Sequence, residues 1–178
     1  MNCNSAPCRR EQEAPNGAVS PLSDGESVIR FVRTSDWLVR DQSGKVSLTS
    51  SAFPQQELAR KKGKTASVLR EIAGPQEVKR RAKACNKVLE WRDDPVVAKS
   101  EVLPIRNILD AIGRREACVY ADPITDDSGV CITHASVVRA CPLPPDDKRL
   151  EWLKLRLKLA ELFAEVYHCS GTVLVLPK

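Results

Sequence analysis

The sequence predicts an α+β fold, in which a small mixed sheet packs against about three helices. Short segments rich in β-branched residues are typical of strands, and two long stretches carry apolar residues at helical spacing. The predicted elements follow the order β-β-α-α-β-β-α-β, which favours α+β over a parallel α/β sheet. The 178 residues, 42% apolar and 29% charged, are ordinary for one globular domain with its own core. We expect a single domain over residues 27–178.

A polar segment, residues 1–26, precedes this domain and is predicted to be a flexible, disordered tail. It contains Pro7, Pro15 and Pro21 together with two glycines. It has no apolar segment typical of a secretory signal, and no apolar run in the chain approaches the ~20 residues that cross a bilayer. We therefore expect a cytoplasmic protein with no membrane contact.

The domain begins with two predicted strands joined by a turn. Residues 27–32 (SVIRFV) are dense in β-branched and aromatic residues, and residues 46–53 (VSLTSSAF) are predicted to form a second, short strand. Between them, residues 41–45 (DQSGK) place Gly44 after polar residues that favour a turn. Residues 59–67 (ARKKGKTAS) are predicted to form a basic loop.

Two helices and several strands follow. A helix is predicted over 75–91, because a proline opens it and apolar residues recur at helical spacing on one face. A second helix is predicted over 104–113, ending at a glycine. The remaining predicted elements are strands at 117–121, 130–138 and 172–177, with a turn at 123–129.

The segment 148–168 has two interpretations. Its centre alternates leucine with lysine or arginine, which alone is typical of a strand. If the segment is instead a helix, each residue is rotated by ~100° about the helix axis from the one before it. The charged residues then form a narrow stripe, and the apolar residues cover an arc of roughly 220° beside it. Because Leu, Lys, Glu and Ala favour helices, we predict a helix, part of whose arc contacts another protein. The expected interface residues are Trp152, Leu155, Arg156, Leu159 and Phe163.

His134, in the predicted strand 130–138, also has two interpretations. A histidine followed by an alanine on a strand resembles the histidine segment of papain-like thiol hydrolases. Catalysis would need a nucleophilic cysteine, ideally at a helix N-terminus. Cys85, on the apolar face of a predicted helix, and Cys118, within a predicted strand, lack that context. The favoured interpretation is a strand histidine held by a hydrogen bond.

A second enzyme hypothesis is centred on Arg30. An arginine on a first strand followed by a Ser/Thr-rich segment, here residues 47–51, resembles one class of ADP-ribosyltransferases. That class also carries a late Glu-x-Glu motif, which the C-terminal half of this chain lacks. His134 and Arg30 are therefore the candidate catalytic residues of an alternative in which the chain is a small enzyme.

The sequence shows no motif for a metal or a cofactor, and we expect neither. Its seven cysteines include no Cys-x-x-Cys pair, so they are predicted to be mostly free thiols in a reducing compartment. The Gly-Lys-Thr at residues 63–65 lacks the upstream glycine and the preceding strand of a phosphate-binding loop.

Positive charge is concentrated in residues 60–92, where eleven Lys and Arg face three Glu, a net charge of +8 in a chain of +5. Such a local field suits an anionic partner. Aromatic residues make up only 4% of the chain, so any nucleic acid would be contacted at its backbone rather than by base stacking. The expected contact residues are Lys61, Lys62, Lys64, Lys79, Arg80, Lys83 and Lys87.

Four segments, VIRFVRTSDW, SLTSSAF, ASVLREIAGPQEV and ADPITDDSGVCITHASVV, together resemble a group of short uncharacterised bacterial proteins. The matching residues are Arg30, Asp36, Trp37, Ser51, Ala52, Phe53, Ser67, Val68, Asp122, Pro123, His134 and Ala135. The resemblance implies a bacterial source and carries no established activity. We expect a non-catalytic accessory or adaptor subunit of a bacterial multi-protein assembly, which binds another protein subunit and has nucleic acid as a further candidate partner. The alternative is the small enzyme centred on His134.

Overall fold

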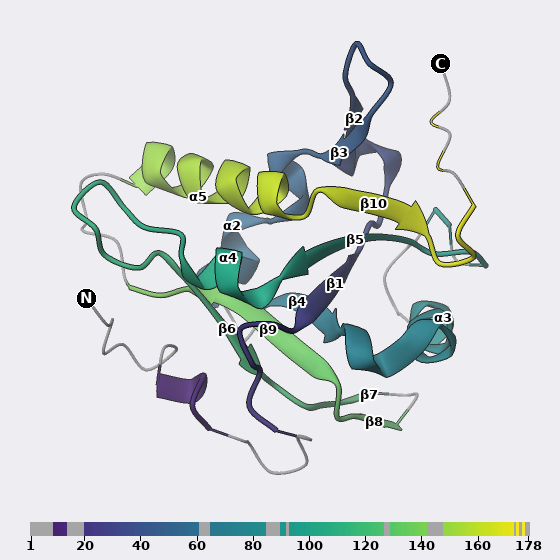
Figure 1. Ribbon diagram of the computed structural model, residues 1–178, viewed down its shortest axis with the longest axis horizontal. Helices are drawn as coiled ribbons and strands as arrows, with labels where there is room; N and C mark the ends of the chain where they lie inside the picture. The colour runs from purple at the N-terminus through teal and green to yellow at the C-terminus, as the bar shows by residue number, and fades with distance from the viewer. Residues whose placement is uncertain are drawn as a thin grey trace.

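The computed structural model describes residues 9–13, 20–60, 65–84, 90–91, 93–126, 129–141 and 148–172, together with 174 and 176. A six-stranded sheet lies at its centre, with strand order β10-β5-β1-β4-β9-β6 and every neighbouring pair antiparallel (Figure 1). Its strands are β1 (Ser27–Phe31), β4 (Ala66–Arg70), β5 (Val96–Glu101), β6 (Ala117–Ala121), β9 (His134–Arg139) and β10 (Glu165–His168). The predicted α+β fold is confirmed, although the sheet is antiparallel throughout and not mixed.

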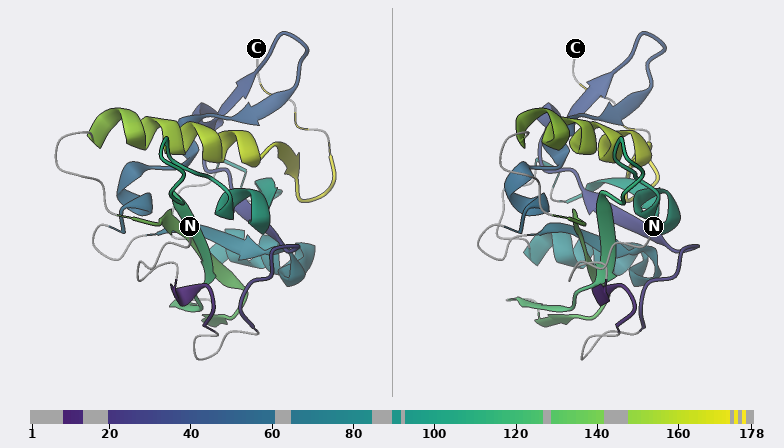
Figure 2. Two further views of the ribbon diagram at one scale, coloured as in Figure 1. Left: turned by 60° about the vertical axis from the view of Figure 1, so that its left-hand side comes forward. Right: turned by 90° about the vertical axis from the view of Figure 1, so that its left-hand side faces the viewer.

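Helices cover both faces of this sheet, with α5 along one face and α3 against the other (Figures 1 and 2). The helices are α2 (Gln55–Leu58), α3 (Gly74–Ala84), α4 (Val102–Arg106) and α5 (Lys148–Leu162), and the 3-10 turns are η1 (Ser35–Trp37), η2 (Ser50–Ala52) and η4 (Glu71–Ala73). Alternation along β1 supplies both layers, because successive side chains of a strand point to opposite faces. Val28 belongs to the main core with Leu155 of α5, whereas Ile29 packs with Val78 of α3.

Two small hairpins flank the central sheet. Their strands are β2 (Leu38–Arg40) with β3 (Val46–Leu48), and β7 (Ile124–Asp126) with β8 (Gly129–Cys131). The turn predicted at 41–45 is confirmed. There the Asp41 carboxylate accepts hydrogen bonds from the main-chain N–H groups of Ser43 and Lys45, and Gly44 has a positive φ of 86°.

The helix predicted over 104–113 is wrong beyond its first turn, because α4 ends at Arg106. The Asp110 carboxylate accepts hydrogen bonds from the main-chain N–H groups of Ile112, at 3.0 Å, and Arg114, at 2.8 Å. Such a local side-chain bond gives the backbone an alternative to the helix. The helix predicted over 75–91 is present as α3 up to Ala84, and residues 85–89 lie outside the described part.

The helix predicted over 148–168 is too long at its C-terminal end. α5 stops at Leu162, and residues 165–168 form β10, in which Val166 pairs with Ala98 of β5. Phe163, at the junction, is fully buried in the main core. Main-chain pairing with β5 and burial of this ring therefore outweigh the helix propensity of the last turns.

The strand predictions need several corrections. The strand predicted over 46–53 ends at Leu48, and η2 follows it. The turn predicted over 123–129 contains β7. β4 and β5, two of the central strands, are not among the predicted elements, and the predicted basic loop runs into the start of β4. The strand predicted over 130–138 is broken by a turn at Ile132 and Thr133, so that His134 opens β9. Thr172, Leu174 and Leu176 of the predicted last strand are not in a strand, and residues 173, 175 and 177 lie outside the described part.

Part of the predicted N-terminal tail contacts the domain. Leu22 is buried in the main core, and the Glu11 side chain is buried beside β6. Glu26 accepts a hydrogen bond from Nε of Arg70 at 2.8 Å. Residues 1–8 and 14–19 lie outside the described part. In the part of the chain that the structure describes, every helix is too short or too polar to span a membrane.

Candidate functional site

The inner side of α5 packs into the domain. Leu155, Leu159 and Phe163 are fully buried, Trp152 is nearly so, and the rings of Phe53 and Phe163 lie 5.1 Å apart between centroids. These four residues of the expected interface therefore hold α5 on the sheet and are not available to a partner of the folded chain. The predicted helix is present, but the side of its wide apolar arc that faces the sheet depends on long-range contacts that the sequence pattern does not encode.

The outer side of α5 carries a row of exposed leucines. Leu150, Leu153 and Leu157 are 55%, 40% and 46% exposed. Their spacing of three and four residues places them in line along one face of the helix. The apolar arc is thus only partly covered, and its open part lies opposite the side chains that pack on the sheet.

Arg156, the fifth expected interface residue, lies between these two sides. It is half-buried, and its Nε donates a hydrogen bond to the main-chain oxygen of Ser50 at 3.0 Å. The guanidinium therefore ties α5 to η2 within the same chain.

Charged side chains of both signs flank the leucine row. Arg149 and Lys154 lie beside the row with exposed side chains, and Glu161 is the exposed acidic neighbour. The ammonium of Lys158 instead contacts the buried Glu116. Lys154 also forms an ion pair of 2.8 Å with Glu151, one turn earlier. The outer side of α5 thus combines an apolar line with a border of mixed charge, in which Arg149 is an exposed cation and Lys154 is paired with Glu151.

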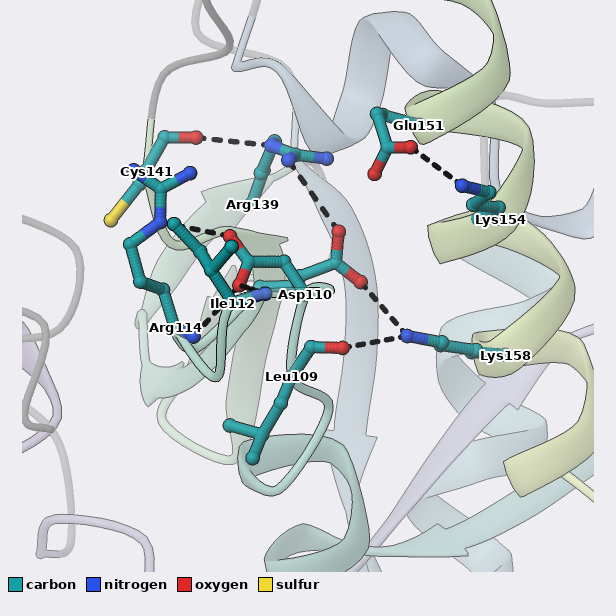
Figure 3. A network of polar contacts seen from close by, with 10 residues as sticks. Leu109, Asp110, Ile112, Arg114, Arg139, Cys141, Glu151, Lys154 and Lys158 are labelled. Atoms are coloured by element: carbon teal, nitrogen blue, oxygen red, sulfur yellow. Dashed lines mark hydrogen bonds and ion pairs between the residues drawn. The ribbon is translucent and has the colours of Figure 1, made fainter.

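A buried carboxylate, Glu116, anchors α5 from the sheet side. Its two cationic partners, Arg139 and Lys158, are labelled in Figure 3. One of its oxygens lies 3.3 Å from Nζ of Lys158, and the other lies 3.5 Å from the guanidinium of Arg139. Lys158 also donates to the main-chain oxygen of Leu109 at 2.7 Å, and Arg139 lies over the ring of Trp152 at 5.1 Å. Burial lowers the pKa of Arg139, and Glu116 opposes that shift. These contacts hold α5, which carries the leucine row, on the rest of the domain at Lys158 and Trp152.

His134 is buried at the start of β9, in register with Leu69 of β4. Its Nδ1 lies 2.6 Å from the main-chain oxygen of Asp122. Because a carbonyl oxygen can only accept, this ring nitrogen donates. The geometry supports the interpretation of His134 as a strand histidine held by a hydrogen bond.

Asp122 also organises a group of hydroxyls between β6 and β9. Its Oδ2 accepts a hydrogen bond of 2.6 Å from Ser136, whose Oγ lies 2.8 Å from Oγ1 of Thr65. Its Oδ1 pairs with Arg10 at 3.1 Å, and burial raises the pKa of the neighbouring Tyr120. Ser136 is fully buried, so it has no access to a substrate.

No described cysteine is an accessible thiol beside His134, and the half-buried thiol of Cys141 follows the opposite end of β9. Cys118 is fully buried and disulfide-bonded, and its partner lies outside the described residues. Cys131 is a buried thiol, and burial raises the pKa of Cys169 to about 11, which keeps that thiol protonated at neutral pH. Cys85 lies outside the described residues.

Arg30, the other candidate catalytic residue, is buried in a structural network. Its three guanidinium nitrogens donate to the main-chain oxygens of Ala52, at 2.7 Å, and Ser67, at 3.0 Å, and to the Glu57 carboxylate at 2.9 Å. Arg33 binds the second oxygen of Glu57 at 3.0 Å. Burial lowers the pKa of Arg30, and the charge of Glu57 opposes that shift. Arg30 joins β1, η2 and β4 and has no path to a substrate.

α3 displays only part of the expected basic surface. Lys83 is exposed and Lys79 is half-buried, but Arg80 forms an ion pair of 2.6 Å with Glu77. Arg81, which is buried, pairs with the same carboxylate at 2.8 Å and also donates to the β7–β8 hairpin. Lys61, Lys62, Lys64 and Lys87 lie outside the described residues. The positive field of α3 is therefore weaker than its count of basic residues implies.

The ion pairs of Glu77 predict a specific dependence of stability on pH. The hydrogen bond from Arg80, assisted by Arg81, lowers the pKa of Glu77 from 4.5 to about 2. Since the folded-state pKa is the lower one, the stabilisation is fully present above pH 4.5 and is lost as pH falls through about 2. We expect Glu77→Gln to cost about 0–1 kcal/mol at neutral pH, because Arg80 is about half exposed and glutamine keeps an oxygen that can accept from the buried Arg81, and almost nothing near pH 2.

Urea denaturation of both proteins at a series of pH values measures this difference. Glu13→Gln is a suitable control, because the Glu13 side chain is exposed. A cost of Glu77→Gln that stayed the same down to pH 2 would contradict the assignment.

Several residues of the predicted resemblance contact one another in and beside the sheet. Arg30 binds Ala52 and Ser67 through their main-chain oxygens, and its guanidinium lies 4.8 Å from the ring of Phe53. Val68 pairs with Ala135 between β4 and β9, and His134 binds Asp122. In these contacts the residues of the pattern pack and form hydrogen bonds within the fold.

The chain is a small α+β protein in which the described polar clusters connect elements of the fold. The leucines on the outer face of α5 are exposed to solvent. Among the described residues, no group of three or more His, Cys, Asp or Glu side chains could hold a metal ion. No family model, no curated protein and no solved structure matches this chain.

Proposed function

We propose that this protein is a non-catalytic accessory subunit of a bacterial cytoplasmic assembly, which binds another protein through the outer face of α5. The observation that carries the proposal is the row of Leu150, Leu153 and Leu157, each about half exposed. Single exposed leucines are common, but leucines aligned on a rigid helix form a continuous apolar surface that a partner can cover.

The partner that fits this surface is an amphipathic helix with acidic residues beside its apolar stripe. Apolar residues spaced by three and four positions pack against a second helix with the same spacing. Lys154 and Lys158 are already paired with Glu151 and Glu116, so the exposed cation at the end of the row is Arg149. An acidic residue of the partner would complement Arg149 there, whereas a second copy of α5 would offer no such carboxylate from its own leucine row.

The two other functions have less support from the geometry. An enzyme centred on His134 would need an accessible nucleophile, and Ser136, Cys118 and Cys131 are fully buried. Backbone contact with nucleic acid would rely on α3, where Glu77 pairs with both Arg80 and Arg81.

Substitution on the outer face of α5 tests the proposal. The double variant Leu153→Glu/Leu157→Glu places two carboxylates in the row without touching the buried side of the helix. We expect it to keep its melting temperature and to lose the partner, with a Kd at least tenfold higher, which is about 1.4 kcal/mol. The matched control is Ile72→Glu, which changes an exposed apolar residue at η4, beside α3.

The measurement has two steps. Proteins captured by the wild-type chain, the double variant and the control are first compared by quantitative mass spectrometry in the native host. The protein lost only with the double variant is then purified and titrated by calorimetry. Capture of the same proteins at the same yield by all three chains would refute the proposal. So would a captured partner that contains no acidic amphipathic helix.

A further inference from the structure

On the outer edge of β6, main-chain groups form hydrogen bonds with charged side chains instead of with another strand. The Val119 N–H donates to the Glu11 carboxylate at 2.7 Å, and the Val119 carbonyl accepts from Arg106 at 3.1 Å. The Ala117 carbonyl accepts from Nε of Arg115 at 2.9 Å. An edge strand with unpaired main-chain groups is a template for another chain, so this cover prevents strand addition at β6.

The carboxylate of Glu11 sits in a site built for an anion. One oxygen, Oε1, receives the Val119 N–H, a guanidinium nitrogen of Arg115 at 2.8 Å and the ion pair with Arg106 at 3.3 Å. The Glu11 side chain is 7% exposed. Two cations and a main-chain donor that converge on one oxygen form a strong carboxylate site, because charge-assisted bonds are strongest where water is excluded.

A second contact of opposite charge lies next to the first. Arg10, the neighbour of Glu11 in the sequence, pairs with Asp122 at 3.1 Å, and its guanidinium lies 4.3 Å from the centre of the Tyr120 ring. The β6 edge therefore offers a carboxylate site and a guanidinium site to two consecutive residues. A cavity of about 410 Å³ adjoins the carboxylate site and is lined in part by Glu11, Arg106 and Arg115.

We infer that this edge is a docking site for a peptide segment with an Arg-Glu pair, which residues 9–13 of the chain occupy in cis. The segment that fits the site in trans is the same one from a second copy, because its side chains match every contact. A short tether gives the cis segment an effective concentration in the millimolar range, so the trans segment binds only when the cis contacts are lost. The site and the α5 surface are on different elements and are independent.

Peptide binding to the full chain tests the inference. A fluorescent peptide of residues 9–16 stands for the segment of a second copy and is titrated by anisotropy in reducing buffer. We expect saturable binding to the variant Arg10→Ala/Glu11→Ala, whose own segment cannot dock, and at least tenfold weaker binding to the wild type. Adding Arg115→Ala to that variant, or replacing the glutamate at position 11 of the peptide by glutamine, should abolish binding. Equal binding to the wild type and the variant, or no binding to the variant, would overturn the inference.

Hydrogen exchange of the Val119 amide provides a measurement that needs no peptide. In Glu11→Gln, which keeps the shape of the side chain, we expect this amide to exchange at least tenfold faster than in the wild type, while Glu13→Gln leaves the rate unchanged. An unchanged Val119 rate in Glu11→Gln would show that Glu11 does not hold the segment on β6, and would also overturn the inference.

Discussion

Replacing Glu57 by alanine is expected to destabilise the protein by about 3–5 kcal/mol, because it leaves the buried charge of Arg30 without a counterion. The Arg30 side chain is 2% exposed and that of Glu57 is 8% exposed. The other two bonds of Arg30 go to neutral main-chain oxygens, which cannot neutralise a guanidinium. Urea denaturation followed by circular dichroism measures the loss.

Two controls separate this explanation from a general sensitivity of the region. Arg33→Ala removes the more exposed partner of the same carboxylate and should cost at most about 1 kcal/mol. The double variant Arg30→Met/Glu57→Leu removes both buried charges and should be more stable than Glu57→Ala, since the cation left without Glu57 is then Arg33, whose side chain is 23% exposed. If the double variant were less stable than Glu57→Ala, the cost would arise from lost packing rather than from the charge of Arg30.

The second large effect is expected at Glu116, with a loss of about 3 kcal/mol in Glu116→Ala. Glu116 and Arg139 are both largely buried, with side chains 2% and 8% exposed, so removal of the carboxylate strands a buried guanidinium. Lys158 would also lose its contact with the sheet side. We therefore expect faster hydrogen exchange in the C-terminal half of α5, which carries Lys158, as well as a lower free energy of unfolding.

Glu151→Ala is the matched control for Glu116→Ala. It removes the carboxylate of a solvated pair with Lys154 on the same helix and should cost about 0–1 kcal/mol. Equal losses in the two variants would contradict the role of Glu116 as the buried anchor. A loss of stability in Glu116→Ala without faster exchange in α5 would mean that the carboxylate stabilises the strands and not the helix.

These anchors bear on the proposed binding function. Lys158, Arg156 and the buried leucines fix α5 from its inner side, so the outer row needs no rearrangement to meet a partner. A surface that is ordered before binding loses less conformational entropy on association. The exposed leucines are therefore free to serve binding, while the buried ones serve stability.

Local sequence patterns were sufficient for several elements. The β-branched run of β1, the apolar run of β6 and the polar turn at 41–45 are set by neighbours in the chain, and all three were predicted correctly. The wide apolar arc of α5 was likewise readable, because its period depends only on the order of residues. In all these elements, the interactions that determine the local structure are between residues only a few positions apart in the sequence.

The tertiary structure alone decided which side of α5 is buried, where that helix ends and what the charged residues do. Residues 165–168 become a strand because β5 offers them main-chain partners from more than sixty residues away. Arg30 meets Glu57, and Glu116 meets Lys158, across 27 and 42 residues of sequence. No periodicity encodes such pairs, because they form only when the sheet has brought their strands together. The sequence by itself thus determined the class of fold and the amphipathic helix, whereas long-range pairing determined which polar residues are structural and which surface remains open.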